Sequence, residues 1–305
     1  MTDLMYYTAQ SRMTDPGCRA ELLAGLPDDI AEIRRVVSGL VVHYRADKPL
    51  EQGVPAERMR EIDTRYAETM LGRLAELADG PLSKPRSTTQ RLVGCCRDFT
   101  VLYVSALRAH GIPARARVGF ATYFVADYAV DHEVAEVWDA DQERWRLIDA
   151  QIDEGHAGPD GTRVDPLDLT LDQFVPAGAA WQRCRAGIAD PASFVVDPAL
   201  DIPETRGRPQ IAHDLVQDLA ALNSTEMLLW DDWGWGDDKL FTDAEHELLD
   251  RVAAVTTVGD SEEIHGLYDS EPPLRVPDIV TTADPLGGPL RHIAWRGRSN
   301  PNSPN

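Results

Sequence analysis

The chain has 305 residues, 43% of them hydrophobic, which is enough to bury a full core. Its 51 acidic and 30 basic residues give a formal charge of −21, which repels phosphate backbones and argues against nucleic acid as a partner. The first residues show no signal peptide, and no stretch approaches the roughly 18 apolar residues of a membrane span. We therefore expect a cytoplasmic protein without a membrane partner.

Apolar periodicity predicts three helices in the first part of the chain. The first opens at Leu26-Pro27-Asp28-Asp29 and carries its apolar stripe to Val41, and the second spans residues 56–78. A loop over residues 82–90, rich in Ser, Thr and Pro, follows. The clearest helix then begins near Arg97-Asp98 and ends at His110-Gly111-Ile112-Pro113, where proline prevents its continuation.

Three strands are predicted after this helix, because β-branched and aromatic residues alternate with polar ones between turn signals. They span residues 114–123, 131–139 and 144–150. Helices followed by an antiparallel sheet indicate the α+β class.

The region after Asp201 is predicted to be a helical extension packed on the core. It contains a helix over residues 213–222 and a capping box, Thr242-x-x-Glu245, that opens another. Three tryptophans and four aspartates lie between Trp230 and Asp238, for which packing onto the core is the favoured interpretation over a lid or a cation-binding surface. We divide the chain into a catalytic domain (1–200), the extension (201–286) and a disordered tail (287–305).

Cys96 stands at the start of the clearest helix, where unpaired amides and the helix dipole favour a thiolate. A nucleophilic thiol also needs a base and a group that orients the base. His132 begins one predicted strand and Asp149 ends the next. If paired residues have numbers that sum to 281, the two side chains face each other across a hairpin closed by residues 139–142.

These segments resemble the transglutaminase-like superfamily. Gly94-Cys95-Cys96-Arg97-Asp98 is similar to the G-x-C-R-D pattern of bacterial members, and the continuation from Leu107 to Arg115 is similar to their L-R-x-x-G-I-P-A-R sequence. The strands that carry His132 and Asp149 also resemble those of the family. The resemblance implies a papain-like core in which a nucleophile helix packs on an antiparallel sheet, with Cys, His and Asp in that order. Glu133 departs from the small residue usual after the histidine.

Other candidate residues receive weaker interpretations. Gln90 lies six residues before the thiol and is a candidate oxyanion donor, beside the backbone N–H of Cys96. Cys95 is interpreted as a buried neighbour. His43 lies 53 residues before Cys96, near the caspase spacing of about 50, but the caspase signature is absent, so a structural role is favoured. No metal-ligand spacing is present among the cysteines and histidines, and we expect neither metal nor cofactor.

The sequence therefore predicts a cysteine-dependent acyl-transfer enzyme that forms a thioester at Cys96 from an amide or peptide substrate. Hydrolysis by an amidase or peptidase is slightly favoured. The alternative enzyme is a transamidase that passes the acyl group to an amine in the biosynthesis of a small molecule or peptide. A non-catalytic binding protein on the same scaffold is a further alternative, against which the intact order of Cys, His and Asp counts.

Overall fold

The computed structural model describes residues 3–236 and 241–296. Its largest sheet has the strand order β5-β4-β3-β6, all antiparallel, and β7 pairs in parallel with β4. The strands of this sheet are β3 Ala114–Ala121, β4 Ala129–Asp139, β5 Arg144–Ile148, β6 Phe174–Pro176 and β7 Phe194–Val195. The predicted α+β class is confirmed, and so are the three predicted strands, each of which has one end that differs by two residues.

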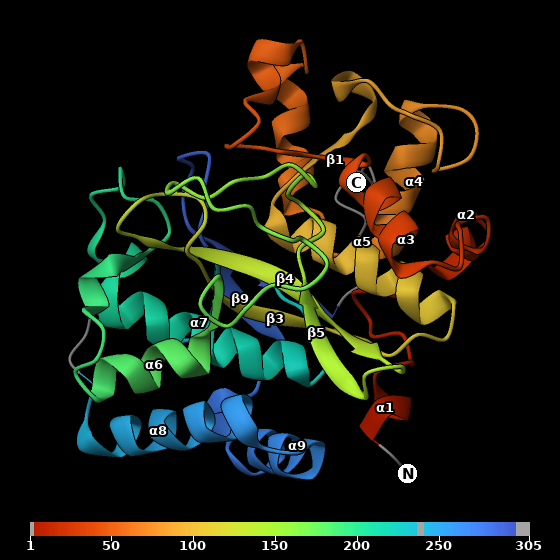
Figure 1. The fold of residues 1–305 in the computed structure, drawn as a ribbon. Coiled ribbons are helices and arrows are strands. Elements are labelled where there is room, and N and C mark those ends of the chain that lie inside the picture. Colours follow the sequence, from red (N-terminus) through yellow and green to blue (C-terminus); the bar gives the residue numbers. More distant parts are fainter. Residues whose placement is uncertain (1–2, 237–240, 297–305) are drawn as a thin grey trace.

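Helices cover the sheet from two sides. In Figure 1, α3, α4 and α5 lie above and to the right of the sheet, whereas α6 to α9 lie below it. The helices are α1 Asp3–Tyr6, α2 Ala20–Ala24, α3 Ile30–Ser38, α4 Ala67–Leu77, α5 Cys96–Ala109, α6 Ala177–Arg185, α7 Gly207–Leu222, α8 Asp243–Val258 and α9 Ser261–Ser270. No helix in the described ranges is long and apolar enough to cross a membrane.

Helix α5, which carries Cys96, packs on the sheet, as predicted. Its apolar face joins β4, β5 and the helices α3 and α4 in one core cluster that includes Phe99, Leu102, Ala135 and Ile148. The Thr100 hydroxyl donates to the Glu133 carbonyl oxygen at 3.0 Å and ties α5 to β4 directly. A helix buried along its length in this way holds its first residue at a fixed height above the sheet.

The first predicted helix is shorter than its apolar pattern indicates. Asp29 caps α3 by accepting the Glu32 N–H at 2.9 Å, and the helix ends at Ser38 before Gly39. Val41–His43 forms strand β1, which pairs in parallel with β2, Leu92–Gly94. The prediction that the helix continues to Val41 is therefore wrong. Val41 and Val42 instead pair with β2, a strand about 50 residues further along the chain.

The second predicted helix is divided in two. Ala56–Asp63 is a 3₁₀ helix, η3, and α4 begins at Ala67. Thr64 and Tyr66 between them are extended. Arg65 lies at this break, and its guanidinium donates to the buried Asp231 carboxylate at 2.6 Å. The sequence did not predict this contact.

The hairpin register differs from the predicted one. Ala135 pairs with Ile148 and Asp139 with Arg144, so paired numbers sum to 283 and the loop covers residues 140–143. The sum of 281 is wrong by two residues, because Trp138 and Trp145 form the cross-strand pair and Glu143 turns the chain at a φ of +50°. Since side chains alternate with a period of two, this shift keeps His132 and Asp149 on the predicted face.

The C-terminal region is more than a helical extension. Thr242 caps α8 with Glu245 in the predicted capping box, and α7 starts six residues before its predicted start. A three-stranded sheet also forms here, with the order β10-β9-β8 from Arg291–Ala294, Ile279–Thr282 and Asp231–Asp232. Strand β10 lies in the tail for which we expected disorder. Residues 297–305 of that tail lie outside the described residues.

The tryptophan-rich segment is used for packing as far as it is described. Trp235 is buried, and its indole N–H donates to the Pro273 carbonyl oxygen at 2.9 Å. Trp230 makes an edge contact with Tyr44, with ring centroids 6.1 Å apart. The last two residues of the segment, 237 and 238, lie outside the described residues.

Candidate active site

Cys96 is the first residue of α5 and is buried, with 6% of its surface exposed. Cys95 caps the helix: its sulfur accepts the Asp98 N–H, and the Asp98 carboxylate accepts the Cys95 N–H at 2.9 Å. Gly94 precedes the cap because a Cβ there would lie 2.7 Å from Asp98 Oδ2 and 2.9 Å from Val41. Gly94, Cys95 and Asp98 thus form the start of a helix that begins directly after strand β2.

The surroundings of Cys96 favour its thiolate. A hydrogen bond from the Cys95 thiol and further ones from His132 and His43 outweigh burial and hold the pKa of Cys96 well below its ordinary value. The Cys95 thiol shows the opposite behaviour, because the hydrogen bond to Cys96 and burial raise its pKa well above the ordinary value. Cys95 therefore keeps its proton and shares it with the neighbouring sulfur.

The structure brings His132 and Asp149 together, as predicted from the sequence. His132 Nε2 lies 2.9 Å from Asp149 Oδ2, and both residues are almost fully buried. Burial alone would lower the pKa of His132, but the Asp149 carboxylate and the hydrogen bond to Cys96 raise it to about 10. With Nε2 on Asp149, Nδ1 is the nitrogen left for the thiol, so the order of contacts is Cys96, His132, Asp149.

Asp149 is held by further donors. Its Oδ2 accepts the Tyr123 hydroxyl at 2.6 Å, and its Oδ1 accepts the Gln151 N–H at 2.7 Å. Despite burial, the charge of His132 and these hydrogen bonds lower the pKa of Asp149 to about 2. The Arg34 Nε–H donates to the Asp149 carbonyl oxygen at 2.8 Å. The carboxylate is thus fixed in its ionised form and in one orientation.

Aromatic rings enclose the imidazole of His132. Phe124 meets it edge to face with ring centroids 5.0 Å apart, and Tyr123 does so at 6.2 Å. His156 packs on the same two rings, and its Nε2–H donates to the Tyr123 carbonyl oxygen at 3.1 Å. This wall keeps water away from the His132–Asp149 pair, where a lower dielectric strengthens the ionic contact.

Several carboxyl groups lie around the thiol in addition to Asp149. Burial and the charge on Cys96 raise the pKa of Asp131 to about 7, and burial raises the pKa of Asp98 to about 6. Burial raises the pKa values of Glu133 and Asp214 well above their ordinary values. One oxygen each of Asp131, Glu133 and Asp214 is buried without a hydrogen-bond partner.

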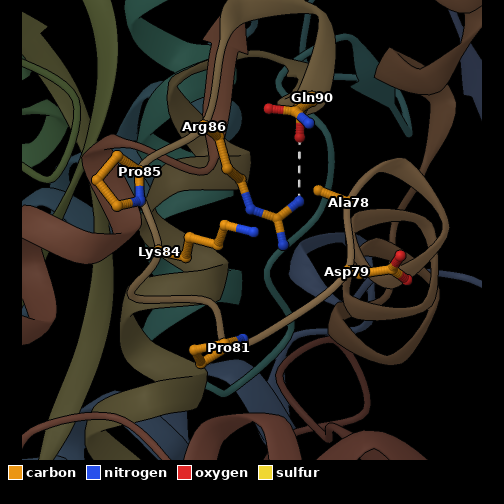
Figure 2. Close-up of a pocket in the computed structure, with 7 residues that line it drawn as sticks. All are labelled: Ala78, Asp79, Pro81, Lys84, Pro85, Arg86 and Gln90. Atoms are coloured by element: carbon orange, nitrogen blue, oxygen red, sulfur yellow. Dashed lines mark hydrogen bonds between the residues drawn. The ribbon is translucent and has the colours of Figure 1, made fainter.

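Gln90, the sequence-based candidate for the oxyanion donor, lies in the short helix η4, Thr88–Gln90. Its side-chain oxygen accepts the Ser87 N–H at 3.1 Å and caps this helix. Figure 2 shows the residue at the rim of a pocket, where the Arg86 guanidinium donates to the Gln90 carbonyl oxygen at 3.1 Å. Cys96 does not line this pocket.

His43 lies at this site, although the sequence analysis favoured a structural role for it. It ends β1 opposite Gly94, two residues before the thiol, and its ring hydrogen-bonds Cys96. The strand pairing that places it there is parallel and joins residues about 50 positions apart, so no local pattern revealed it. In the sequence, the separation between His43 and Cys96 was the one signal that pointed to a histidine near the thiol.

In the part of the chain that the structure describes, Cys18 and Cys184 have no histidine partner of this kind. Cys18 is exposed, Cys184 is buried among apolar side chains, and all four cysteines are free. No group of three or more His, Cys, Asp and Glu side chains suited to a metal ion occurs among residues 3–236 and 241–296.

Cys96 at a helix start, His132 on β4 and Asp149 directly after β5 lie in the arrangement that the sequence predicts for a papain-like cysteine site on an α+β core. Comparison with known families gives the same class: residues 35–150 match the family described as "Transglutaminase-like superfamily". This part of the chain is a transglutaminase-like superfamily domain, which confirms the resemblance seen in the sequence.

Other comparisons add little to this assignment. No curated protein matches the chain. One solved structure, from Cytophaga hutchinsonii and described as a "putative cysteine protease", is similar to it with 16% sequence identity and a TM-score of 0.34. That match covers 55% of this chain and 47% of the other, so this chain spans about half the length of that protein.

Proposed function

We propose that the protein is a cysteine-dependent acyl-transfer enzyme that cleaves an amide or peptide bond through a thioester at Cys96. The observation that carries the proposal is that His132 contacts both of the other residues: it hydrogen-bonds the Cys96 sulfur and lies 2.9 Å from Asp149. The pKa of Cys96 is lowered and that of His132 is raised, so the two groups favour a thiolate beside an imidazolium. This is the reactive pair of a cysteine nucleophile.

The first half of the reaction follows from this pair. Cys96 Sγ bonds to the carbonyl carbon, the carbonyl oxygen becomes negative, and the N–H of Cys96 at the helix start is a donor for it, since the first amides of a helix lack intrahelical acceptors. When the bond to nitrogen breaks, the leaving amine takes the proton of His132. The imidazole can then remove a proton from water as water attacks the thioester.

Transamidation is the second candidate, and the buried acids favour it. Asp131 and Asp214 both interact with the charge on Cys96, and each has a buried oxygen without a partner. A protonated amine arriving as acyl acceptor would favour the ionised form of these acids and be attracted to it, whereas neutral water would not. An assay that offers lysine methyl ester with an activated acyl donor, and measures the ratio of amide to acid product, separates the two candidates.

The test of the acyl-transfer proposal is detection of a covalent intermediate. The chain is exposed to pooled peptides and amides and to p-nitrophenyl acetate, and its intact mass is measured. We expect an acyl adduct that maps to Cys96 in the wild-type chain and is absent from Cys96→Ala, with His132→Ala also inactive. Failure of every donor to label Cys96 in the wild-type chain would contradict the proposal.

Cys95→Ala is the matched control for the nucleophile. This variant should keep the adduct at Cys96, because the neighbouring thiol only shares its proton with the reactive sulfur. The variant should also need a higher pH for labelling, since a hydrogen bond that lowers the pKa of Cys96 is lost. Loss of labelling in a folded Cys95→Ala chain would shift the nucleophile by one residue.

The free state of the four cysteines supports a reducing compartment as the place where the enzyme acts. A thiolate nucleophile is stable there, and the cytoplasm is the compartment we propose. Labelling of Cys96 in extracts prepared with and without reductant tests this. Equal labelling after prolonged exposure to oxidant would remove the need for a reducing environment.

A further inference from the structure

His43 contacts the Cys96 sulfur from a strand that precedes helix α5 in the chain. It lies on β1, which precedes the nucleophile helix, whereas His132 lies on β4, which follows it. The parallel pairing of β1 with β2 places His43 against Gly94, and β2 leads through Cys95 into α5. Both imidazoles hydrogen-bond the sulfur of Cys96.

The two imidazoles differ in what holds their second nitrogen. His43 Nδ1 accepts the backbone N–H groups of Arg45 and Ala46, at 3.2 and 3.1 Å. An Nδ1 that accepts two hydrogen bonds leaves the proton of the neutral ring on Nε2. The nitrogen of His43 that faces the sulfur is therefore a donor, fixed in direction by the turn after β1.

We propose that His43 is a further catalytic residue of the acyl-transfer reaction, donating from Nε2 to the Cys96 sulfur at rest and to the oxyanion formed from the acyl donor. The inference rests on the proposed function of Cys96 as nucleophile. This side-chain donor is a different residue from the sequence-based candidate Gln90, whose side chain caps η4.

The electron flow explains why one donor can serve both states. When Sγ bonds to the acyl carbon, the π pair of the carbonyl moves onto the oxygen, which is then two bonds from the sulfur. The Nε2–H that contacted the thiolate can follow the charge to this oxygen with a small displacement. On collapse the pair returns to the C–O bond, the bond to the leaving group breaks, and an amine leaving group takes its proton from His132.

His43 and His132 therefore have separate tasks. His132 faces a carboxylate, which stabilises the imidazolium and lets the ring hold a proton for the leaving group. His43 faces two N–H donors, which disfavour a proton on Nδ1. With Nδ1 occupied as an acceptor, Nε2 is the nitrogen that donates a hydrogen bond.

Two substitutions of His43 separate the donor from the anchor. In His43→Asn the side-chain oxygen occupies the position of Nδ1 and can accept the two N–H groups, but nothing reaches the sulfur. In His43→Gln the amide nitrogen occupies the position of Nε2 and restores a donor. His292→Asn on strand β10 is the matched control for the loss of a histidine elsewhere.

Acylation of Cys96 by p-nitrophenyl acetate, followed by release of p-nitrophenolate and by peptide mass, is the main measurement. We expect His43→Asn to acylate about 10²–10³ times more slowly, with His43→Gln recovering most of the rate and His292→Asn unchanged. The pH profile of Cys96 alkylation by iodoacetamide should move to higher pH in His43→Asn and return in His43→Gln.

The outcomes separate this inference from the proposed function. A folded His43→Asn chain that acylates and alkylates like the wild type overturns the role of His43. Equal slowing of His43→Asn and His43→Gln also overturns it, because a donor at Nε2 would then be without effect. A wild-type chain that never carries an acyl group at Cys96 overturns the proposed function, and the alkylation profile still tests the contact between His43 and the sulfur.

Discussion

Asp149→Asn isolates the charge that holds the imidazolium. The substitution keeps the size of the side chain and an oxygen for the Gln151 N–H, but removes the negative charge 2.9 Å from His132. The pKa of His132 rises from 6.5 to about 10 in spite of burial, mainly because of this carboxylate. At about 1.4 kcal/mol for each tenfold change, the preference for the charged ring is on the order of 5 kcal/mol.

Loss of that preference should convert the thiolate–imidazolium pair into a neutral thiol and imidazole near pH 7. We expect the pH midpoint for alkylation of Cys96 by iodoacetamide to rise by more than about one pH unit, and acylation to slow by about 10²–10⁴-fold. The assay follows the mass of the Cys96 peptide at a series of pH values. Asp168→Asn, which loses an exposed ion pair with Arg144, is the matched control.

Unchanged alkylation and acylation in a folded Asp149→Asn chain would refute the reasoning, since the histidine would then be charged without its carboxylate. A rise in the alkylation midpoint with an unchanged acylation rate would also contradict it, because acylation depends on the same thiolate. Both rates are measured on the same preparation, after circular dichroism has shown the fold to be intact.

Three more predictions follow from the packing around the site. Gly94→Ala should reduce both stability and Cys96 reactivity, because the new Cβ would lie 2.7 Å from the Asp98 carboxylate; Cys96 alkylation and thermal unfolding measure this. Arg117→Met should lower the free energy of unfolding by about 3–5 kcal/mol in urea titrations, because Asp218 would stay buried without its partner. As pH falls from 4 to 2, the free energy of unfolding of the wild-type chain should decrease by about 2 kcal/mol more than that of Asp149→Asn. The reason is that the pKa of Asp149 is lowered from 3.8 to about 2 in the folded chain. The resulting stability is present above pH 3.8 and disappears as the folded carboxylate protonates.

The sequence predicted the elements whose signals are local. The helix from Cys96 and the strands with His132 and Asp149 have continuous patterns and clear ends, and their order along the chain pointed to the family. The hairpin register was wrong by two residues, yet it kept the side chains on one face because a strand repeats every two residues. The roles of Cys96, His132, Asp149 and Gln90 remain predictions.

The features that the sequence did not predict depend on distant partners. Strand β1 has three residues and reads as the end of a helix until β2 is placed beside it. The position of His43 at the thiol follows from that pairing and from the turn that anchors its ring. The same limit applies to β10, which is polar and short and exists as a strand through its pairing with β9.

The region beyond Asp201 supports the nucleophile helix although the family match ends at Ala150. The Arg97 guanidinium, fully buried at the start of α5, donates to the Glu226 carbonyl oxygen. On α7, Asp218 accepts both the Val118 N–H of β3 at 2.8 Å and the Arg117 guanidinium. A buried charge is tolerated when its partners are in place, and these partners come from both sides of the boundary near residue 201. We therefore interpret the C-terminal helices as part of the scaffold that fixes Cys96, not as a separate module.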